Sequence, residues 1–395
     1  MNFKNKKLYI ENIEATKIAK KFGTPAYCYS LSKLKSNIKT FKNNFESINP
    51  LICFSVKSNS NIKILKIMRK FGLGADVVSK GELTIALKAG INPKKIVFSG
   101  IGKTFDEIRF AIEKNILLIN AESESEIKEI ENIAKRKRKR ISIGLRLNPN
   151  IDAKTLKKIS TGKNENKFGV LESSFLKIIK KFKNSKYLNL RCLSVHIGSQ
   201  ITDYRPYAKM ISVVQNTIKK SKHNFDFVDL GGGMGIKYNS KGKSLNYRKY
   251  NLIIKNFLRK NNVKIIFEPG RSIIANTAIL LTKIIYIKTN RSKKFIILDA
   301  AMNDLMRPAL YGSTHQIIPL KKNSKIINKT HDFVGPICES TDKFLSLKKY
   351  QKLNEKENLA ICDVGAYGMV LASNYNLRTK ACEIMVNKSS LKLIL

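Results

Sequence analysis

Acidic side chains, tryptophan, histidine and paired cysteines are scarce in this sequence of 395 residues. It contains no tryptophan, four histidines and six cysteines, and no two cysteines form a CxxC pair. This spacing argues against zinc-finger and disulfide-scaffold proteins, so we expect no bound metal and a reducing compartment. The sequence also has neither an apolar signal core near its start nor an uninterrupted run of ~18 apolar residues. We therefore expect a cytoplasmic protein without membrane helices.

The shortage of acids leaves a large excess of positive charge. Lys and Arg number 75 against 29 Asp and Glu, which gives a formal net charge of +46. Such a charge raises the question of a nucleic-acid or anionic-membrane partner. The lysines are scattered through every segment, however, and the densest run, residues 135–140 (KRKRKR), follows a helix-like segment, as a solvated helix end would. Because no base-stacking aromatic pattern accompanies them, we interpret the charge as a composition bias and expect neither partner.

Short apolar runs alternate with longer amphipathic, Lys-rich runs from residue 51 onward. This alternation is typical of repeated βα units that build a parallel sheet. Eight candidate strands can be counted, at residues 51–57, 74–78, 95–100, 116–120, 141–147, 188–197, 225–230 and 263–268. Eight successive βα units close into a barrel, so we predict an α/β fold with a (β/α)8, TIM-like barrel.

The pattern changes after residue 280 to strand-like runs separated by loops, with few helical intervals. These runs lie at residues 282–288, 293–300, 331–337, 358–364 and 380–386. They predict a second, all-β domain at residues 281–395, a β-sandwich or barrel. The opening residues 1–35 contain strand-like ends of their own, so we expect them to join the β domain and leave the barrel at residues 36–280.

Polar and titratable residues collect at the predicted ends of the barrel strands. Barrel active sites lie at this carboxyl-terminal face, and the candidates there are Lys57, Asp76, Ser99, Asn120, Arg146, His196, Gly231 and Glu268. Lys57 has the most distinctive chemistry, since a desolvated and deprotonated lysine amine can form a Schiff base. Taken alone, Lys57 could equally be a lysine that reaches toward solvent, and His196 a core histidine at a strand end.

The loops after the seventh and eighth predicted strands suit a phosphate group. The segment VDLGGGMGIKY (228–238) places three consecutive glycines after a strand, where bare backbone amides can approach an anion. The segment EPGRS (268–272) adds a carboxylate and a guanidinium. Barrels commonly bind phosphate in these two loops, although a tight turn would also explain the glycines alone. Together the two loops predict a cofactor that carries a phosphate.

A series of motifs, taken in order, resembles a known family. The motifs are FSVKSN (54–59), GADVVSKGEL (74–83), VFSGIGKT (97–104), HIGSQ (196–200), DLGGGMGI (229–236), EPGRS (268–272), DAAMNDLMRPALYG (299–312), VGPICES (334–340) and DVGAYGMVLASNYN (363–376). From about residue 20 to the C-terminus the chain resembles the diaminopimelate decarboxylases, which are alanine-racemase-like, barrel-type decarboxylases dependent on pyridoxal 5'-phosphate. The resemblance implies conversion of meso-2,6-diaminopimelate to L-lysine and CO2, the last step of lysine biosynthesis.

The resemblance also implies roles for individual residues at the cofactor. Lys57 matches the lysine that forms the Schiff base, and His196 matches the residue whose ring stacks on the cofactor. Glu268 matches the carboxylate that pairs with the pyridine nitrogen. The family surrounds the cofactor phosphate with positions that correspond here to Ser199, Gly232, Gly233, Gly270, Arg271 and Tyr367.

The substrate positions of the family correspond to Arg271, Arg307, Tyr311, Glu339 and Tyr367. Arg307 and Tyr311 would hold the non-reacting end of the substrate, where a carboxylate calls for guanidinium geometry. Cys338 and Glu339 resemble a pair that reaches the site from the second subunit of a homodimer, Cys338 as proton donor and Glu339 toward the distal ammonium. Taken alone, a cysteine before a glutamate is ordinarily an inert, half-buried thiol.

Two alternatives remain open. The chain could be a pyridoxal-phosphate decarboxylase of another basic amino acid or a carboxylated polyamine, such as ornithine, arginine or carboxynorspermidine. An amine-ended substrate calls for an acidic group without guanidinium neighbours, whereas Arg307 and Glu339 together suit an amino-acid end. A non-enzymatic RNA-binding protein is supported by the net charge alone. The departures from the family pattern remove no catalytic group and include Ser55, Ser58, Leu156 and Thr341.

Overall fold

The computed structural model describes residues 1–395 except 154–160, 163–164, 239–241, 292 and 395, so Leu156 lies outside the described residues. The chain forms two compact units. Unit 1 comprises Met1–Lys39, Lys237–Gly242 and Arg271–Leu395, and unit 2 comprises Thr40–Ile236 and Lys243–Gly270. The boundaries expected from the sequence lie at residues 35 and 280.

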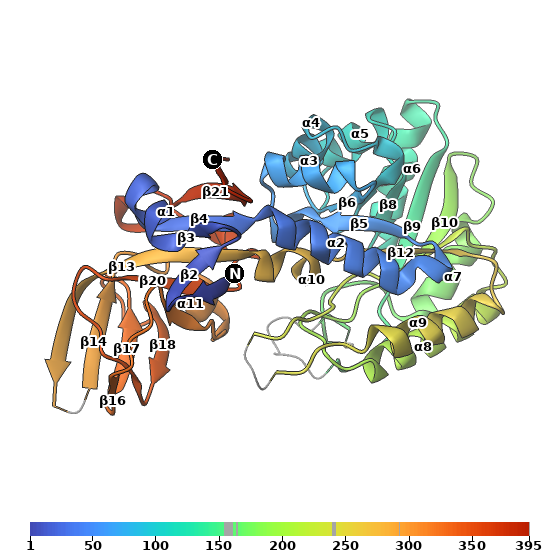
Figure 1. The fold of residues 1–395 in the computed structure, drawn as a ribbon. Coiled ribbons are helices and arrows are strands. Elements are labelled where there is room, and N and C mark those ends of the chain that lie inside the picture. The colour runs from blue at the N-terminus through green and yellow to red at the C-terminus, as the bar shows by residue number, and fades with distance from the viewer. Residues whose placement is uncertain (154–160, 163–164, 239–241, 292, 395) are drawn as a thin grey trace. The chain divides into compact units, whose positions relative to one another are not determined.

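Unit 2 is a closed barrel of parallel strands (Figure 1). In chain order the strands are β5 (Leu51–Ser55), β6 (Gly74–Val77), β7 (Ile96–Phe98), β8 (Leu118–Ala121), β9 (Ile141–Leu147), β10 (Leu188–Val195), β11 (Phe227–Asp229) and β12 (Lys264–Phe267). Each strand pairs with the next one along the chain, and β12 closes the ring by pairing with β5. The barrel predicted from the alternating pattern is therefore confirmed.

Helices separate the barrel strands along the chain and lie outside them (Figure 1). They are α3 (Ile62–Lys70), α4 (Lys80–Lys88), α5 (Phe105–Glu113), α6 (Glu124–Arg136), α7 (Glu172–Phe182), α8 (Arg205–Ser221) and α9 (Tyr247–Leu258). Ser79, Thr104 and Ser123 cap α4, α5 and α6, and each side chain accepts a backbone N–H three residues later. At α5, Glu107 returns a hydrogen bond to the cap and completes a capping box. These caps fix the start of each helix and so the length of the loop before it.

The barrel interior changes from apolar to polar along its strands. One layer is a cluster of buried apolar side chains: Cys53, Val97, Leu118, Cys192 and Ile266. Two residues farther along the chain from each member of this layer, a buried polar side chain follows: Ser55, Ser99, Asn120, Ser194 and Glu268. Because a buried polar group costs free energy unless it is hydrogen-bonded, a polar layer at the carboxyl ends of the strands marks this end as functional.

Unit 1 is built mainly from strands. Its largest sheet has the order β18-β17-β14-β13-β4-β21-β22, with β20 pairing to β13 and β15 to β20. These strands are β4 (Ala26–Ser30), β13 (Ala278–Asn290), β14 (Lys293–Leu298), β15 (Ile317–Pro319), β17 (Thr330–Val334), β18 (Lys343–Leu347), β20 (Asn358–Cys362), β21 (Cys382–Asn387) and β22 (Ser390–Leu393). Two small sheets consist of β1 (Asn2–Lys4), β2 (Lys7–Ile10) and β3 (Ile13–Glu14), and of β16 (Ile326–Ile327) and β19 (Tyr350–Gln351).

The strand β4 lies inside the large sheet although it comes early in the chain. All its residues are buried, and it pairs antiparallel with β13 and parallel with β21. The first helices, α1 (Ala15–Phe22) and α2 (Leu31–Phe45), flank β4 in sequence. The opening segment thus completes the sheet that the C-terminal strands begin.

One part of the expected all-β domain is helical. Residues Arg307–Tyr311 form the short helix α11, and Pro308 lies in its first turn. Proline suits that position because its fixed φ is helical and its missing N–H would have no partner there. The helix ends at Gly312, whose φ of 61° is left-handed. The second domain is therefore a β domain that carries a helical insertion.

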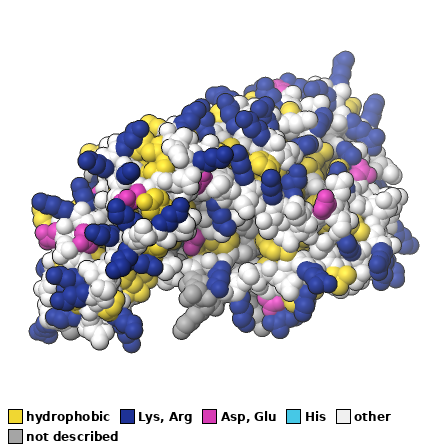
Figure 2. Space-filling view, in the orientation of Figure 1, with side chains coloured by type: hydrophobic (Ala, Val, Ile, Leu, Met, Phe, Trp, Pro, Cys, Tyr) yellow, Lys and Arg dark blue, Asp and Glu magenta, His cyan; other side chains and the backbone are white. Residues whose placement is uncertain are grey.

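Positive side chains are distributed broadly over the surface. Figure 2 shows Lys and Arg scattered over the visible face rather than gathered over one element. Some of the scarce carboxylates pair with more than one cation, and Glu113 lies 3.3 Å from Arg109 and 2.9 Å from Lys137. Lys137 belongs to the densest basic run, so part of that run is a solvated ion pair. Within the described part of the chain, no helix is long and apolar enough to cross a membrane.

Candidate active site

Lys57 lies in a short 3-10 turn, Val56–Ser58, directly after β5. Its Nζ is 3.2 Å from Oδ2 of Asp76 in the neighbouring strand β6. The Asp76 side chain is fully buried, whereas 40% of the Lys57 side chain is exposed. Ser55 donates to the same Oδ2 at 2.7 Å, which fixes the carboxylate. Lys57 is thus an amine oriented by a buried carboxylate and still within reach of a small molecule.

Two further buried carboxyl groups, Asp229 and Glu268, lie close enough to influence each other's pKa. Glu268 follows β12 and accepts from Ser99 Oγ at 3.1 Å. Asp229 ends β11 and accepts the Gly231 N–H and an N–H of Asn120, both at 2.9 Å. Burial and the neighbouring Asp229 raise the pKa of Glu268 well above its ordinary value, and burial raises the pKa of Asp229 to about 6. Burial and the neighbouring carboxylate thus favour the protonated form of Glu268.

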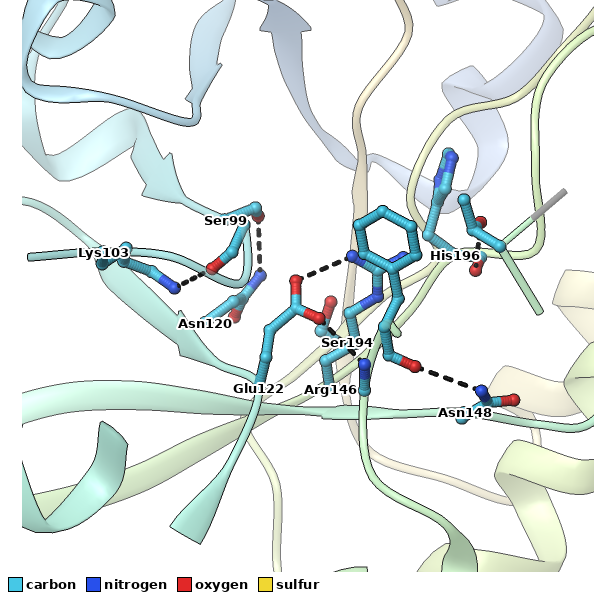
Figure 3. Close-up of polar contacts among 12 residues, drawn as sticks. Ser99, Lys103, Asn120, Glu122, Arg146, Asn148, Ser194 and His196 are labelled. Carbon is cyan, nitrogen blue, oxygen red and sulfur yellow. Dashed lines mark hydrogen bonds and ion pairs between the residues drawn. The ribbon is translucent and has the colours of Figure 1, made fainter. Parts of the chain in front are cut away.

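His196 follows β10 at the same end of the barrel (Figure 3). Its Nδ1 accepts the backbone N–H of Gly232 at 3.2 Å, so the neutral ring carries its proton on Nε2. Burial lowers the pKa of His196 well below its ordinary value, and the nearby charges of Arg146 and Lys57 lower it further. A neutral, oriented imidazole is the form that stacks on a flat ring without adding charge.

The glycines after β11 leave no room for side chains. Gly231 and Gly233 have left-handed φ values of 63° and 83°. A Cβ on Gly232 would lie 2.1 Å from the carbonyl oxygen of Glu268, and one on Gly233 would lie 2.2 Å from that of Gly198. This glycine loop, residues 231–233, is therefore a close-packed turn that has room for bare backbone only, as loops that bind anions through backbone amides do.

Two other residues expected at the phosphate, Ser199 and Gly270, lie in the loops after β10 and β12. Ser199 is partly buried. A Cβ on Gly270 would lie 2.8 Å from both Cβ and Oγ of Ser58, the residue after Lys57. Within unit 2, the loop after β12 and the turn that carries Lys57 therefore pack directly against each other.

Glu122 and Arg146 form a buried ion pair at the ends of β8 and β9 (Figure 3). Oε1 of Glu122 is 2.8 Å from Nη1 of Arg146, and Oε2 accepts the Gly169 N–H at 2.8 Å. The guanidinium carbon of Arg146 lies 4.9 Å from the centre of the Phe168 ring. The sequence indicated Arg146 but not Glu122, which comes just after the strand. The available signal for Glu122 was the presence of an acidic residue beside a strand end in a chain that has few acidic residues.

Two buried arginines of unit 1 converge on one tyrosine hydroxyl. Arg271 donates from Nη1 to Oη of Tyr238 at 2.6 Å, and Arg307 donates from Nη1 to the same oxygen at 3.0 Å. Arg271 is 8% exposed and Arg307 is 4% exposed. Burial lowers the pKa of Arg307, and the charge of Arg271 lowers it further. In the described part of the chain, Arg307 forms no ion pair with a carboxylate.

Sequence reasoning found both arginines but missed two residues that bind them. Tyr238 is the last residue of the glycine-rich motif VDLGGGMGIKY. Nothing in the sequence around this tyrosine indicated that it would contact the arginines. His315 is 1% exposed, and its Nε2 lies 2.9 Å from Nη1 of Arg307. With only four histidines in the chain, the rarity of this residue was the one available signal.

The two expected tyrosines of unit 1 differ in their contacts. The Tyr367 ring lies 5.0 Å from the guanidinium carbon of Arg271, and its backbone φ of 56° is left-handed. Such a conformation is costly for a residue other than glycine and persists only where the surroundings hold it. Tyr311 ends α11 and is partly buried, without a side-chain hydrogen bond among the described residues. The structure brings Tyr367 to the arginines more clearly than Tyr311.

Cys338 and Glu339 are both exposed between β17 and β18. The Glu339 carboxylate accepts from the Tyr375 hydroxyl and, at 3.0 Å, from Thr341 Oγ1. These two hydroxyls lower the pKa of Glu339. Thr341, a departure from the family pattern, therefore orients the glutamate. In this chain both residues lie at the surface.

Comparison with known proteins gives one family over the whole chain. The family model described as "Pyridoxal-dependent decarboxylase, pyridoxal binding domain" matches residues 31–275. The diaminopimelate decarboxylase of Aquifex aeolicus is 39% identical over 404 residues, covering 100% of this chain and 94% of the relative.

Solved structures agree with this result. Diaminopimelate decarboxylase from Helicobacter pylori, complexed with L-lysine, is 40% identical with a TM-score of 0.91 and covers 96% of each chain. The enzyme from M. jannaschii, also in complex with L-lysine, is 36% identical with a TM-score of 0.94, covering 100% of this chain and 94% of the other. Full-length similarity at this level, with the barrel and its polar end in place, means that the chain belongs to the diaminopimelate decarboxylase family of pyridoxal-dependent decarboxylases.

Proposed function

We propose that this chain removes one carboxyl group from meso-2,6-diaminopimelate, giving L-lysine and CO2, with pyridoxal 5'-phosphate bound at Lys57. The observation that carries the substrate assignment is the convergence of two buried guanidiniums on Tyr238.

The barrel unit contains groups that fit pyridoxal phosphate. Lys57 supplies an amine at a strand end, and the glycine loop supplies backbone where any Cβ would collide. His196 supplies a neutral ring, because burial holds its pKa far below the ordinary value. Glu268 supplies a buried carboxyl that accepts or shares a proton. Glu268 matches the basic ring nitrogen of the cofactor, Lys57 matches its aldehyde, and the glycine loop matches its phosphate. The residues present therefore fit this cofactor.

When bound to the substrate amine, pyridoxal phosphate accepts the electron pair that the departing CO2 leaves behind. Glu268 would face the pyridine nitrogen and share a proton with it, because burial and the neighbouring Asp229 raise the pKa of its carboxyl group. Asp76 holds the amine of Lys57 in position at 3.2 Å. The neutral Nδ1 of His196 is tied to Gly232, which fixes the plane of the imidazole ring.

The substrate class follows from the charge of unit 1. Two guanidiniums held on one hydroxyl repel each other, and an arriving carboxylate removes that repulsion while forming charge-assisted hydrogen bonds. A substrate that ends only in an amine would add a third positive charge there. Diaminopimelate keeps a carboxylate at its non-reacting end, whereas ornithine and arginine offer only a cation. The arginine pair therefore favours diaminopimelate over the alternative substrates.

The proposal includes a homodimer whose active sites are shared. Cys338 and Glu339 are exposed, and Glu339 is already oriented by Thr341 and Tyr375. In a dimer, Cys338 would donate the proton that replaces CO2, and Glu339 would face the distal ammonium of the substrate. We also propose a cytoplasmic location, supported by the free thiols of all six cysteines.

The test is to measure CO2 release from meso-diaminopimelate, ornithine and arginine separately, with the holoenzyme. We expect release from diaminopimelate alone, and loss of both that activity and the visible cofactor absorbance in Lys57→Ala. Comparable release from ornithine or arginine would overturn the substrate assignment. Retained Schiff-base absorbance in the Lys57 variant would overturn the cofactor lysine.

A further inference from the structure

Arg307 is held on one side by two hydrogen bonds from a single nitrogen. Its Nη1 donates to Oη of Tyr238 at 3.0 Å and lies 2.9 Å from Nε2 of His315. A guanidinium Nη carries two protons, so these contacts use both. The Nε of Arg307 is buried and has no hydrogen-bond partner among the residues that the structure describes. The guanidinium is therefore fixed along one edge, while its Nε–H is left for a ligand.

The contact with His315 requires one particular form of the imidazole. Nδ1 of His315 lies 2.7 Å from the carbonyl oxygen of Cys362, to which it can only donate. The proton is thus on Nδ1, and the lone pair of Nε2 accepts from Arg307. Burial lowers the pKa of His315 to about 3, and the charge of Arg307 contributes to this effect. The ring is therefore neutral at pH 7, with the acceptor lone pair of Nε2 directed at Arg307.

Packing also restricts the imidazole. His315 is 1% exposed, and its ring meets the Tyr238 ring edge-on, with centres 5.4 Å apart and planes at 80°. The guanidinium carbon of Arg307 lies 5.1 Å from the centre of the same tyrosine ring. Tyr238, His315 and Arg307 thus form one closed group in which each side chain limits the other two.

We infer that His315 is a positioning residue for substrate recognition: it locks Arg307 so that the Nε–H edge faces the distal carboxylate of the substrate. This inference rests on the proposed function. A lysine in place of Arg307 could not be fixed in this way, because an ammonium lacks the planar set of donors. His315 therefore acts on affinity for the carboxylate and leaves the reacting end of the substrate alone.

The test compares two ligands that differ by one carboxylate. L-lysine retains the distal carboxylate of diaminopimelate, and cadaverine is lysine without it. Dissociation constants of both ligands are measured for the holoenzyme from changes in cofactor absorbance, in the wild type and in His315→Phe. We expect lysine to bind at least tenfold more weakly to the variant, because a hydrogen bond to a charged group is lost. Cadaverine affinity and the affinity for pyridoxal phosphate should change less than twofold.

Two further variants sharpen the comparison. In His315→Gln the amide oxygen can replace the Nε2 acceptor, so lysine affinity should recover most of its loss. His331→Phe changes another histidine of unit 1 that is 1% exposed but contacts the Lys329 carbonyl, and it should leave both ligands unaffected. With diaminopimelate, His315→Phe should raise KM about tenfold and change kcat less than twofold.

The inference fails if lysine and cadaverine affinities fall together, or if neither changes. If His315→Phe does not fold, 15N NMR of the wild type provides the test instead. The signals of His315 should show a protonated Nδ1 and an unprotonated Nε2 at pH 7. The opposite tautomer would also overturn the inference. The wild type could instead show the expected tautomer and ligand selectivity but fail to decarboxylate diaminopimelate. That result would contradict the proposed function and leave the inference about His315 standing.

Discussion

Replacing Asp229 with asparagine should change how the stability of the cofactor-free protein depends on pH. Asp229 is fully buried, and burial raises its pKa from 3.8 to about 6. A group whose pKa is higher in the folded state stabilises the fold only while it is protonated. Its contribution is therefore complete below pH 3.8 and is lost as the pH rises through about 6.

The magnitude follows from the pKa difference. At about 1.4 kcal/mol for each pKa unit, a rise from 3.8 to about 6 corresponds to a total loss of roughly 3 kcal/mol. About 1.4 kcal/mol of that loss falls between pH 5 and pH 8, since pH 5 lies about one unit below the folded pKa. Glu268, whose pKa is also raised by burial and by Asp229, adds a loss of the same sign.

Asparagine fits the position without the charge. Its amide oxygen can still accept the Gly231 N–H, and its NH2 group can face Asn120. Asn120 has a buried Oδ1 without a hydrogen-bond partner in the described part of the chain, so its amide can turn to accept the new donor. The variant should therefore fold, and its stability should depend less on pH.

The assay is urea unfolding of cofactor-free wild type and Asp229→Asn at pH 5 and pH 8, followed by far-UV circular dichroism. The wild type should lose at least about 1.4 kcal/mol more than the variant between these pH values. Asp106→Asn removes an aspartate whose side chain is 67% exposed and should follow the wild type. Parallel pH profiles of wild type and Asp229→Asn would refute the reasoning.

Three other outcomes are expected. Arg307→Lys should weaken binding of diaminopimelate more than binding of pyridoxal phosphate, because a point charge cannot replace a planar donor edge; equal losses in titrations of both ligands would remove Arg307 from the substrate site. Lys57→Ala and Cys338→Ala, refolded together, should regain activity toward about a quarter of wild type if sites are shared and pairing is random; mixed dimers without activity would contradict the shared site. Gly233→Ala should lower affinity for pyridoxal phosphate at least tenfold in equilibrium dialysis, because its Cβ would lie 2.2 Å from a carbonyl oxygen, whereas Gly102→Ala, with open space around the new Cβ, should not.

The barrel could be predicted because its signal is local. Each parallel strand is buried and reads as a short apolar run, and each helix repeats an amphipathic pattern. Once the strands were located, the residues at their carboxyl ends could be read from the sequence. Lys57, Asp76 and Glu268 were therefore predicted to lie at one end of the barrel without any knowledge of contacts. The strands β15, β16, β18, β19 and β22 were not predicted, because they are short or partly polar and depend on pairing with distant strands.

The site could be predicted less completely, since several of its residues matter only through their partners. Tyr238 binds two arginines that are 33 and 69 residues away in the sequence. His315 is recognisable only when its distance to Arg307 is known, and Glu122 only when its pairing with Arg146 is known. Resemblance to a family supplied roles for Arg271 and Arg307, but a single sequence contains no local pattern that reveals which side chains orient them.

The position of β4 has a consequence for synthesis on the ribosome. Residues 26–30 leave the ribosome early, yet their partners in β13 and β21 are residues 278–281 and 382–386. The barrel strands, residues 51–267, are complete before either partner has been made. Domains generally fold as units during translation, so the barrel can form while β4, apolar and unpaired, waits for the end of the chain. A chain truncated just before residue 382 would leave one edge of β4 permanently open, which predicts aggregation of such fragments rather than a loss of activity alone.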